Sequence, residues 1–240
     1  MLEILPSIDL RNGQVVRLKQ GDYTQQLNYA VDPIQTAQSF SDAGASWLHL
    51  VDLDGAKEGR PAQTDLIARI IRSTKLKVEV GGGIRATEDV QRLLDAGAAR
   101  VVVGTKAMED WHWFEVLVKQ FPQQIVLALD AKEGKVATRG WTNTSDKLAV
   151  DIAAWVTYWP LAAILYTDVA KDGMLQGPNI EHTKSLCEAG NVPVIASGGV
   201  GNLDHIRGLT KIPAWGAIVG RSLYEGTVDL REALQIARSA

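Results

Sequence analysis

Short apolar runs alternate along the chain with amphipathic stretches. The apolar runs are rich in Val, Ile and Leu, which is typical of parallel strands that are buried on both faces. Because strand and helix alternate strictly, the pattern favours a parallel sheet covered by helices. The predicted strands are Glu3–Asp9, Trp47–Asp52, Lys77–Val80, Arg100–Val103, Ile125–Asp130, Ala163–Thr167, Pro193–Ser197 and Gly216–Val219.

Cap and turn residues mark the ends of these elements. Asp32-Pro33 supplies an N-cap followed by a proline at the first helical position, so a helix is expected to begin there. Two further stretches, Gln14–Lys19 and Lys135–Arg139, follow the first and fifth strands after turns at Asn12-Gly13 and Glu133-Gly134. We expect both stretches to form hairpin-like excursions from the sheet.

The chain repeats itself at a spacing of about half its length. Asp9 ends the first predicted strand as Asp130 ends the fifth, Gly82-Gly83 returns as Gly198-Gly199, and Gly104 returns as Gly220. A six-stranded open sheet would not show this half-chain repeat. The repeat therefore predicts a closed (β/α)8 barrel, a TIM barrel, made of two similar half-barrels in one domain over residues 1–240.

Two carboxylates mark the expected centre of the chemistry. In such barrels the reactive groups lie at the carboxyl ends of the strands. Asp9 and Asp130 end strands that are four apart in a barrel of eight, so they should face each other across the mouth. Opposed carboxylates suit acid–base work, in which one group accepts a proton and the other donates one.

Glycine-rich loops follow four of the strands and come in matched pairs. Glycine lets backbone N–H groups approach an anion closely, and the start of the next helix adds its positive dipole. Two pairs half a barrel apart predict a small-molecule ligand with a phosphate at each end. The residues expected to bind these phosphates are Gly82, Gly83, Arg85, Gly104, Thr105, Ser197, Gly198, Gly199, Gly220 and Arg221.

A few other polar or aromatic residues are candidates for contact with this ligand. Arg17 and Arg139 belong to the two hairpin-like stretches, and Trp141 lies in a polar loop where its indole could stack on a flat ring. Thr167 and Asp172 follow the sixth strand at the mouth. Since no cluster of Cys, His and carboxylates has metal-ligand spacing, we expect no metal.

Composition narrows the classes of partner. The 240 residues carry a formal net charge of −3, so no basic surface invites nucleic acid. No apolar run approaches the ~20 residues that a membrane-spanning helix needs. The lone Cys187 excludes an internal disulfide and fits a reducing cytoplasm, where we expect the protein to be. Without an obvious apolar interface stripe, we expect a monomer.

Several motifs match one known family over essentially the whole chain. They are Ile8-Asp9-Leu10, the stretch 15–23, the stretch 49–53, the stretch 80–85, the stretch 102–105, Gly140-Trp141, Thr167-Asp168 and Lys171-Asp172-Gly173. With these motifs the chain resembles the histidine-biosynthetic isomerases that act on N′-(5′-phosphoribosyl)formimino-5-aminoimidazole-4-carboxamide ribonucleotide.

The resemblance implies an Amadori rearrangement of an aminoaldose into an aminoketose, carried out without a cofactor. It implies that Asp9 is the base that takes the proton from C2. The acid is Asp130, which faces the base, or Asp172, which matches the residue given that role in some members of the family. Thr167 matches a supporting residue beside the reacting ribose, and Arg17 and Trp141 match positions that grip the substrate.

Three other functions are alternatives to this activity. The related cyclase that makes imidazole glycerol phosphate carries Val-Lys where this chain has Val16-Arg17, and it lacks the Gly-Trp of the fifth loop. The bifunctional isomerase of actinobacteria, which also acts on phosphoribosylanthranilate, has a loop like Arg139-Gly140-Trp141. Gly81 stands where that family usually carries Ser. A non-catalytic sensor of phosphorylated ligands would keep the glycine loops but would not need Asp9.

Overall fold

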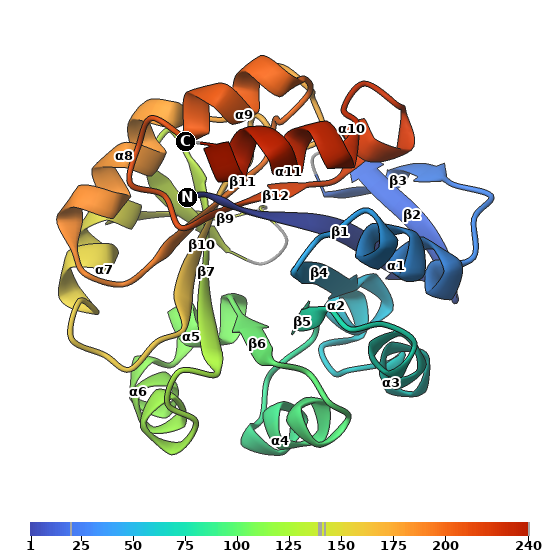
Figure 1. Cartoon of the computed structure of the whole chain (residues 1–240). Coiled ribbons are helices and arrows are strands. Elements are labelled where there is room, and N and C mark those ends of the chain that lie inside the picture. Colours follow the sequence, from blue (N-terminus) through green and yellow to red (C-terminus); the bar gives the residue numbers. More distant parts are fainter. Residues whose placement is uncertain (20, 139–140, 142, 240) are drawn as a thin grey trace.

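Eight parallel strands close into a barrel with helices outside it (Figure 1). The computed structural model describes residues 1–19, 21–138, 141 and 143–239. The strands follow one another around the barrel in the order β10-β11-β12-β1-β4-β5-β6-β7, and pairing of β7 with β10 closes it. The bounds are β1 (Glu3–Arg11), β4 (Trp47–Asp52), β5 (Lys77–Gly81), β6 (Arg100–Val103), β7 (Ile125–Lys132), β10 (Ala163–Asp168), β11 (Val194–Ser197) and β12 (Gly216–Val219). The predicted TIM barrel is confirmed.

Helices connect the strands on the outside of the barrel. The first begins where the sequence predicted, because the Asp32 carboxylate accepts hydrogen bonds from the backbone N–H groups of Ile34 and Gln35, both at 2.9 Å. The helices are α1 (Pro33–Asp42), α2 (Leu53–Glu58), α3 (Thr64–Arg72), α4 (Thr87–Asp95), α5 (Thr105–Glu109), α6 (Trp111–Gln120), α7 (Ala149–Trp155), α8 (Ile180–Ala189), α9 (Leu203–Leu209), α10 (Arg221–Tyr224) and α11 (Leu230–Ser239). None of the helices in the described part of the chain is long and apolar enough to cross a membrane.

Two antiparallel additions extend the sheet beyond β1 and β7. The predicted excursions appear as β2 (Gln14–Lys19) and β8 (Lys135–Thr138). Each is followed by a strand that the sequence did not predict, β3 (Asp22–Asn28) after β2 and β9 (Asn143–Leu148) after β8. Both of these strands are mostly polar, so no alternation of apolar residues marks them in the sequence. Each forms because it pairs with the strand before it.

The apolar core has two layers. The larger one lies between the strands and the surrounding helices, and a smaller cluster fills the interior of the barrel. The interior cluster consists of Leu5, Val102, Val126, Ala163, Leu165, Ile195 and Ile218. Side chains therefore pack the barrel rather than leaving a pore, and only the ends of the strands are open to a ligand.

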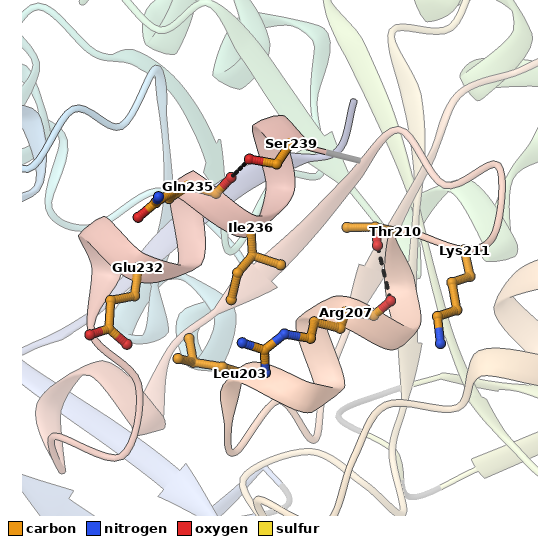
Figure 2. Close-up of a pocket in the computed structure, with 8 residues that line it drawn as sticks. All are labelled: Leu203, Arg207, Thr210, Lys211, Glu232, Gln235, Ile236 and Ser239. Carbon is orange, nitrogen blue, oxygen red and sulfur yellow. Dashed lines mark hydrogen bonds between the residues drawn. The ribbon is translucent and has the colours of Figure 1, made fainter.

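A groove of about 620 Å³ lies outside the barrel, between α9 and α11 (Figure 2). No strand contributes to its lining, which comes from Leu203, Arg207, Thr210, Lys211, Glu232, Gln235, Ile236 and Ser239. Two of the polar groups shown bond locally, since the hydroxyls of Thr210 and Ser239 donate to the carbonyls of Arg207 and Gln235. The groove lies apart from the strand ends that carry the predicted site residues.

Candidate active site

The acidic residues that the repeat predicted lie on opposite strands. Asp9 lies near the carboxyl end of β1 and Asp130 near that of β7, and each of these strands is the fourth from the other in either direction around the barrel. Thr167 on β10 pairs in register with Asp130 and so lies level with it. The strands therefore bring these three side chains to one end of the barrel.

Arg17 links two of the candidate carboxylates. Its Nη1 lies 2.9 Å from Asp9 Oδ2 and its Nη2 lies 3.2 Å from Asp172 Oδ1. Asp9 is 9% exposed and Asp172 is 8% exposed, so these ion pairs lie almost out of contact with water. The hairpin formed by β1 and β2 delivers the guanidinium, because Val16, next to Arg17, pairs in register with Asp9.

One guanidinium cannot balance two buried carboxylates. Burial raises the pKa of Asp172 above its usual value; the charge of Arg17 lowers that pKa, and the charge of Asp9 raises it. Burial alone would lower the pKa of Arg17, but Asp9 and Asp172 raise it above its usual value, so the guanidinium stays charged. The cluster therefore favours one bound proton, which leaves one of the two carboxyl groups neutral and the other charged.

Asp130 has a different environment on the opposite strand. Its Oδ2 accepts a hydrogen bond of 2.8 Å from the Trp141 indole Nε1, and the Thr167 hydroxyl is a further partner. Burial raises the pKa of Asp130, and these hydrogen bonds reduce the shift without cancelling it. Asp130 is thus held mainly by neutral groups, whereas Asp172 faces a cation.

Trp141 lies over this site and connects the antiparallel addition after β1 with the one after β7. Its backbone has φ of 70°, which residues with side chains rarely adopt. Its indole packs against Gly21, between β2 and β3, where a Cβ would lie only 2.8 Å from the ring atom Cε3. Glycine at this position therefore lets the hairpin from the first half touch the loop from the second half.

The glycine pairs have matching backbone conformations in the two halves. Gly82 has φ of 112° and Gly198 has φ of 92°, while Gly83 has 75° and Gly199 has 87°. A Cβ on Gly83 would overlap with the carbonyl oxygen of Gly55, and one on Gly199 would overlap with that of Gly177. These glycines are thus required by backbone packing as well as being available to an anion.

Gly104 and Gly220 form a second matched pair. Gly104 has φ of −115° and ψ of −94°, and Gly220 has φ of −116° and ψ of −98°; each precedes a short helix, α5 or α10. Near Gly220, the hydroxyl of Ser222 and the Nε of Arg17 are buried and have no hydrogen-bond partner among the described residues. Buried polar atoms are nearly always paired, so these two leave room for a further polar partner at this loop.

Some predicted phosphate-binding residues have other partners in the structure. Arg221 Nη1 donates to the carbonyl oxygen of Gly173 at 2.6 Å, and its Nε lies 2.5 Å from Glu225 Oε1. Arg221 therefore fastens the loop that carries Asp172. Arg85 is exposed and lies against Gly59. The remaining arginine prediction, Arg139, lies outside the described residues.

Thr105 and Ser197 occupy the places that the repeat predicted. Thr105 is the first residue of α5 and Ser197 is the last residue of β11, and both keep part of their surface exposed. Ser197 pairs in register with Thr167, so the seventh-strand loop lies beside the sixth strand. The glycine loops and the acidic residues therefore share one end of the barrel.

Comparison with known proteins identifies the family. A family model described as "Histidine biosynthesis protein" matches residues 3–229. The chain belongs to the histidine biosynthesis protein family. The match spans both half-barrels and so covers all the candidate residues at the barrel mouth.

Similar members of the histidine biosynthesis protein family cover nearly the full length of the chain. A protein of Synechococcus sp. (strain JA-2-3B'a(2-13)) is 46% identical over 235 residues, which are 98% of this chain and 90% of the relative. One of Gloeothece citriformis is 47% identical, covering 98% of this chain and 92% of the relative, and one of Thermodesulfovibrio yellowstonii is 44% identical, covering 99% and 98%. All three are named 1-(5-phosphoribosyl)-5-((5-phosphoribosylamino)methylideneamino)imidazole-4-carboxamide isomerase.

Within the described part of this family member, no group of three or more His, Cys, Asp or Glu side chains could hold a metal ion. Two polar residues below the mouth, Ser7 and His49, were not among the site residues predicted from the sequence. Arg17 Nη1 lies 3.3 Å from the Ser7 hydroxyl, and His49 lies next to Ser7 in register. The signal that could have found them is the alternation of inward positions along β1 and β4, because each lies two residues before an inward-facing residue at the mouth.

Proposed function

We propose that the protein is an aldose–ketose isomerase of histidine biosynthesis, acting on the bisphosphorylated aminoaldose that its relatives' name describes. The name contains two 5-phosphoribosyl groups, so the substrate carries a phosphate at each end. Two matched glycine pairs, half a barrel apart, can accept those phosphates. The observation that carries the proposal is the buried cluster of Asp9, Arg17 and Asp172 between them.

The reaction needs an acid and a base close together. The acid protonates the ring oxygen of the ribose while the bond from that oxygen to C1 breaks, which leaves an iminium at C1. The base then takes the proton from C2, and the electron pair of that bond forms the enolamine. A proton added at C1 and loss of the hydroxyl proton at C2 give the aminoketose. The ring oxygen and C2 are both bonded to C1, so the acid and the base must lie within a few ångströms of each other.

Asp9 and Asp172 meet this requirement, because a single guanidinium contacts both carboxylates. We assign Asp9 as the base and Asp172 as the acid, with Arg17 holding the two carboxyl groups close together. Asp130 and Thr167 then bind the reacting ribose from the opposite side, and Trp141 covers it. Gly82, Gly83, Gly104, Thr105, Ser197, Gly198, Gly199 and Gly220 are proposed to receive the two phosphates, with Arg85 and Arg221 at the edges of those loops.

Turnover of two purified compounds tests the assigned activity. The protein is expected to convert the histidine intermediate to its aminoketose and to leave phosphoribosylanthranilate unchanged. The names of the relatives support this single-substrate activity over the bifunctional one. Conversion of phosphoribosylanthranilate at a comparable kcat/KM would establish the bifunctional enzyme, and conversion of neither compound would contradict the proposal.

The dependence of activity on pH tests the assignment of the acid. A raised pKa keeps Asp172 protonated to a higher pH than a free carboxyl group, so kcat/KM should fall as pH rises through the pKa of Asp172. Asp172→Asn should lower kcat by about two to four orders of magnitude and abolish the alkaline decline. Asp130→Asn is the matched variant, and it should keep the decline because its amide oxygen still accepts from Trp141. Loss of the decline in Asp130→Asn alone would move the acid to Asp130.

A further inference from the structure

A row of polar side chains crosses the interior of the first half-barrel below the proposed site. Ser7 on β1 pairs in register with His49 on β4, His49 pairs with Glu79 on β5, and Glu79 pairs with Arg100 on β6. All four side chains are buried. The interior of the second half-barrel is apolar instead, with Val126, Ala163, Leu165, Ile195 and Ile218. The repeat is therefore broken inside the barrel, and the acid–base mechanism does not use the polar row.

Glu79 is the centre of this row and has no exposed surface. Its Oε1 lies 2.6 Å from His49 Nδ1, and its Oε2 lies 2.8 Å from Arg100 Nε. Burial alone would raise the pKa of Glu79, but hydrogen bonds from His49 and Arg100 and the charge of the guanidinium lower it below its usual value. Glu79 is therefore an ionised carboxylate with one partner on each oxygen.

Arg100 anchors the row at the amino-terminal end of the barrel. Its guanidinium lies over the indoles of Trp47 and Trp215, 3.9 and 4.5 Å from their ring centroids. Its Nη2 is buried without a hydrogen-bond partner among the described residues. A buried ion pair adds little net stability compared with apolar packing, and an unpaired nitrogen subtracts from it. Stability alone does not account for Glu79 and Arg100.

His49 lies between Glu79 and Ser7 in this row. A carboxylate oxygen accepts, so His49 Nδ1 is the donor in its contact with Glu79 Oε1. In the tautomer that donates in this way, Nε2 carries a lone pair. The His49 side chain keeps 8% of its surface exposed, whereas that of Glu79 beside it keeps none. Ser7, the register partner of His49, lies 3.3 Å from Nη1 of Arg17, so the imidazole lies beside the proposed site.

We propose that Glu79 and Arg100 are positioning residues that hold His49 with its Nε2 lone pair toward the barrel mouth, where it accepts a hydrogen bond from a hydroxyl group of the sugar phosphate substrate. The inference rests on the proposed isomerase function for the identity of that ligand. Glu79 and Arg100 act only through His49. They set its tautomer and its ring orientation, as the partner of a ligand-binding histidine does in other sites.

Two double variants separate the effect of the hydrogen-bond acceptor on Glu79 from the effect of the ion pair. Glu79→Leu/Arg100→Met removes the ion pair and the acceptor together, and apolar replacement of a buried ion pair is generally tolerated. Glu79→Gln/Arg100→Met also removes the charges but keeps an oxygen that can accept the Nδ1–H of His49. We expect the Leu/Met variant to lose about 10- to 100-fold in kcat/KM, and the Gln/Met variant to recover most of that loss.

A triple variant that also carries His49→Gln separates a positioning role of Glu79 and Arg100 from a merely structural one. If Glu79 and Arg100 act through His49, adding Glu79→Leu/Arg100→Met to His49→Gln should lower kcat/KM little further. Losses that multiply in the triple variant, or equal activity of the Leu/Met, Gln/Met and wild-type proteins, would overturn the proposal. Thermal unfolding of each variant shows which of them are folded and comparable.

The wild-type protein supplies a test that needs no folded variant of the ion pair. In ¹⁵N-labelled protein, the two-bond couplings of the imidazole distinguish Nδ1–H from Nε2–H, and the His49→Gln spectrum identifies the His49 signals. We expect the Nδ1–H tautomer. An Nε2–H tautomer would overturn the proposal. Failure of the wild-type protein to isomerise the aminoaldose would instead remove the proposed function, while the tautomer of His49 would still be measured.

Discussion

Replacement of Asp9 by Asn is expected to lower kcat by about two to four orders of magnitude, the range that a positioned acid–base group contributes. The amide cannot accept the C2 proton, while its size and shape stay close to those of the carboxylate. Arg17 should then pair with Asp172 alone, because it loses the partner that now lies 2.9 Å from its Nη1. The variant should therefore also hold Asp172 more fully ionised, which removes the acid as well as the base.

Steady-state kinetics of the purified variant, measured with the aminoaldose, provide the test. The control is substrate binding followed by Trp141 fluorescence, which should be retained because the glycine loops are unchanged. A kcat within tenfold of the wild-type value would show that Asp9 is not the base. Loss of both binding and thermal stability would show that Asp9 mainly holds the hairpin of β1 and β2 in place.

Replacement of Gly199 by Ala is expected to destabilise the fold by about 2–5 kcal/mol. Part of this cost is the left-handed backbone, with φ of 87°, which costs a residue with a side chain about 1–2 kcal/mol. The rest is the overlap of the new Cβ with the carbonyl oxygen of Gly177, which must move, and overpacking of this kind costs ~1–3 kcal/mol. Thermal unfolding should show a fall in Tm of roughly 5–20 °C.

Gly226→Ala is the matched control for this experiment. Gly226 has φ of 70°, but a Cβ there would meet no atom within 4 Å, so only the backbone cost remains. We expect about 1–2 kcal/mol for this variant. Equal losses at the two positions would show that the close approach of Gly177 to Gly199 does not matter for stability, and that the loop after β11 is free to adjust.

The strand pattern and the repeat predicted the barrel because both depend on local composition. Val, Ile and Leu runs marked all eight barrel strands, and the paired glycines marked the ends of four of them. The strands β3 and β9 were missed because Asp22–Asn28 and Asn143–Leu148 carry few apolar residues. They form by pairing with β2 and β8, and such pairing depends on the tertiary fold rather than on local pattern.

The candidate site residues were chosen from the sequence, but the contacts between them could not be predicted from it. Asp9, Arg17 and Asp172 were all candidates, yet nothing in the sequence shows that one guanidinium contacts both carboxylates. Arg221 is the opposite case, since its place after a glycine suggests a phosphate ligand, whereas its guanidinium bonds Gly173 and Glu225. Long side chains reach several partners, so their contacts follow from the fold and not from the spacing along the chain.

The most direct test of the account is turnover of the aminoaldose by the wild-type protein in D₂O, with NMR analysis of the product. Proton transfer through Asp9 and Asp172 predicts an aminoketose that carries solvent deuterium at C1. An aminoketose without deuterium at C1 would mean that the C2 hydrogen reaches C1 without exchange with solvent, either directly or on a single carboxyl group rather than through two separate ones, and absence of any aminoketose would remove the isomerase itself. Either result would contradict the account.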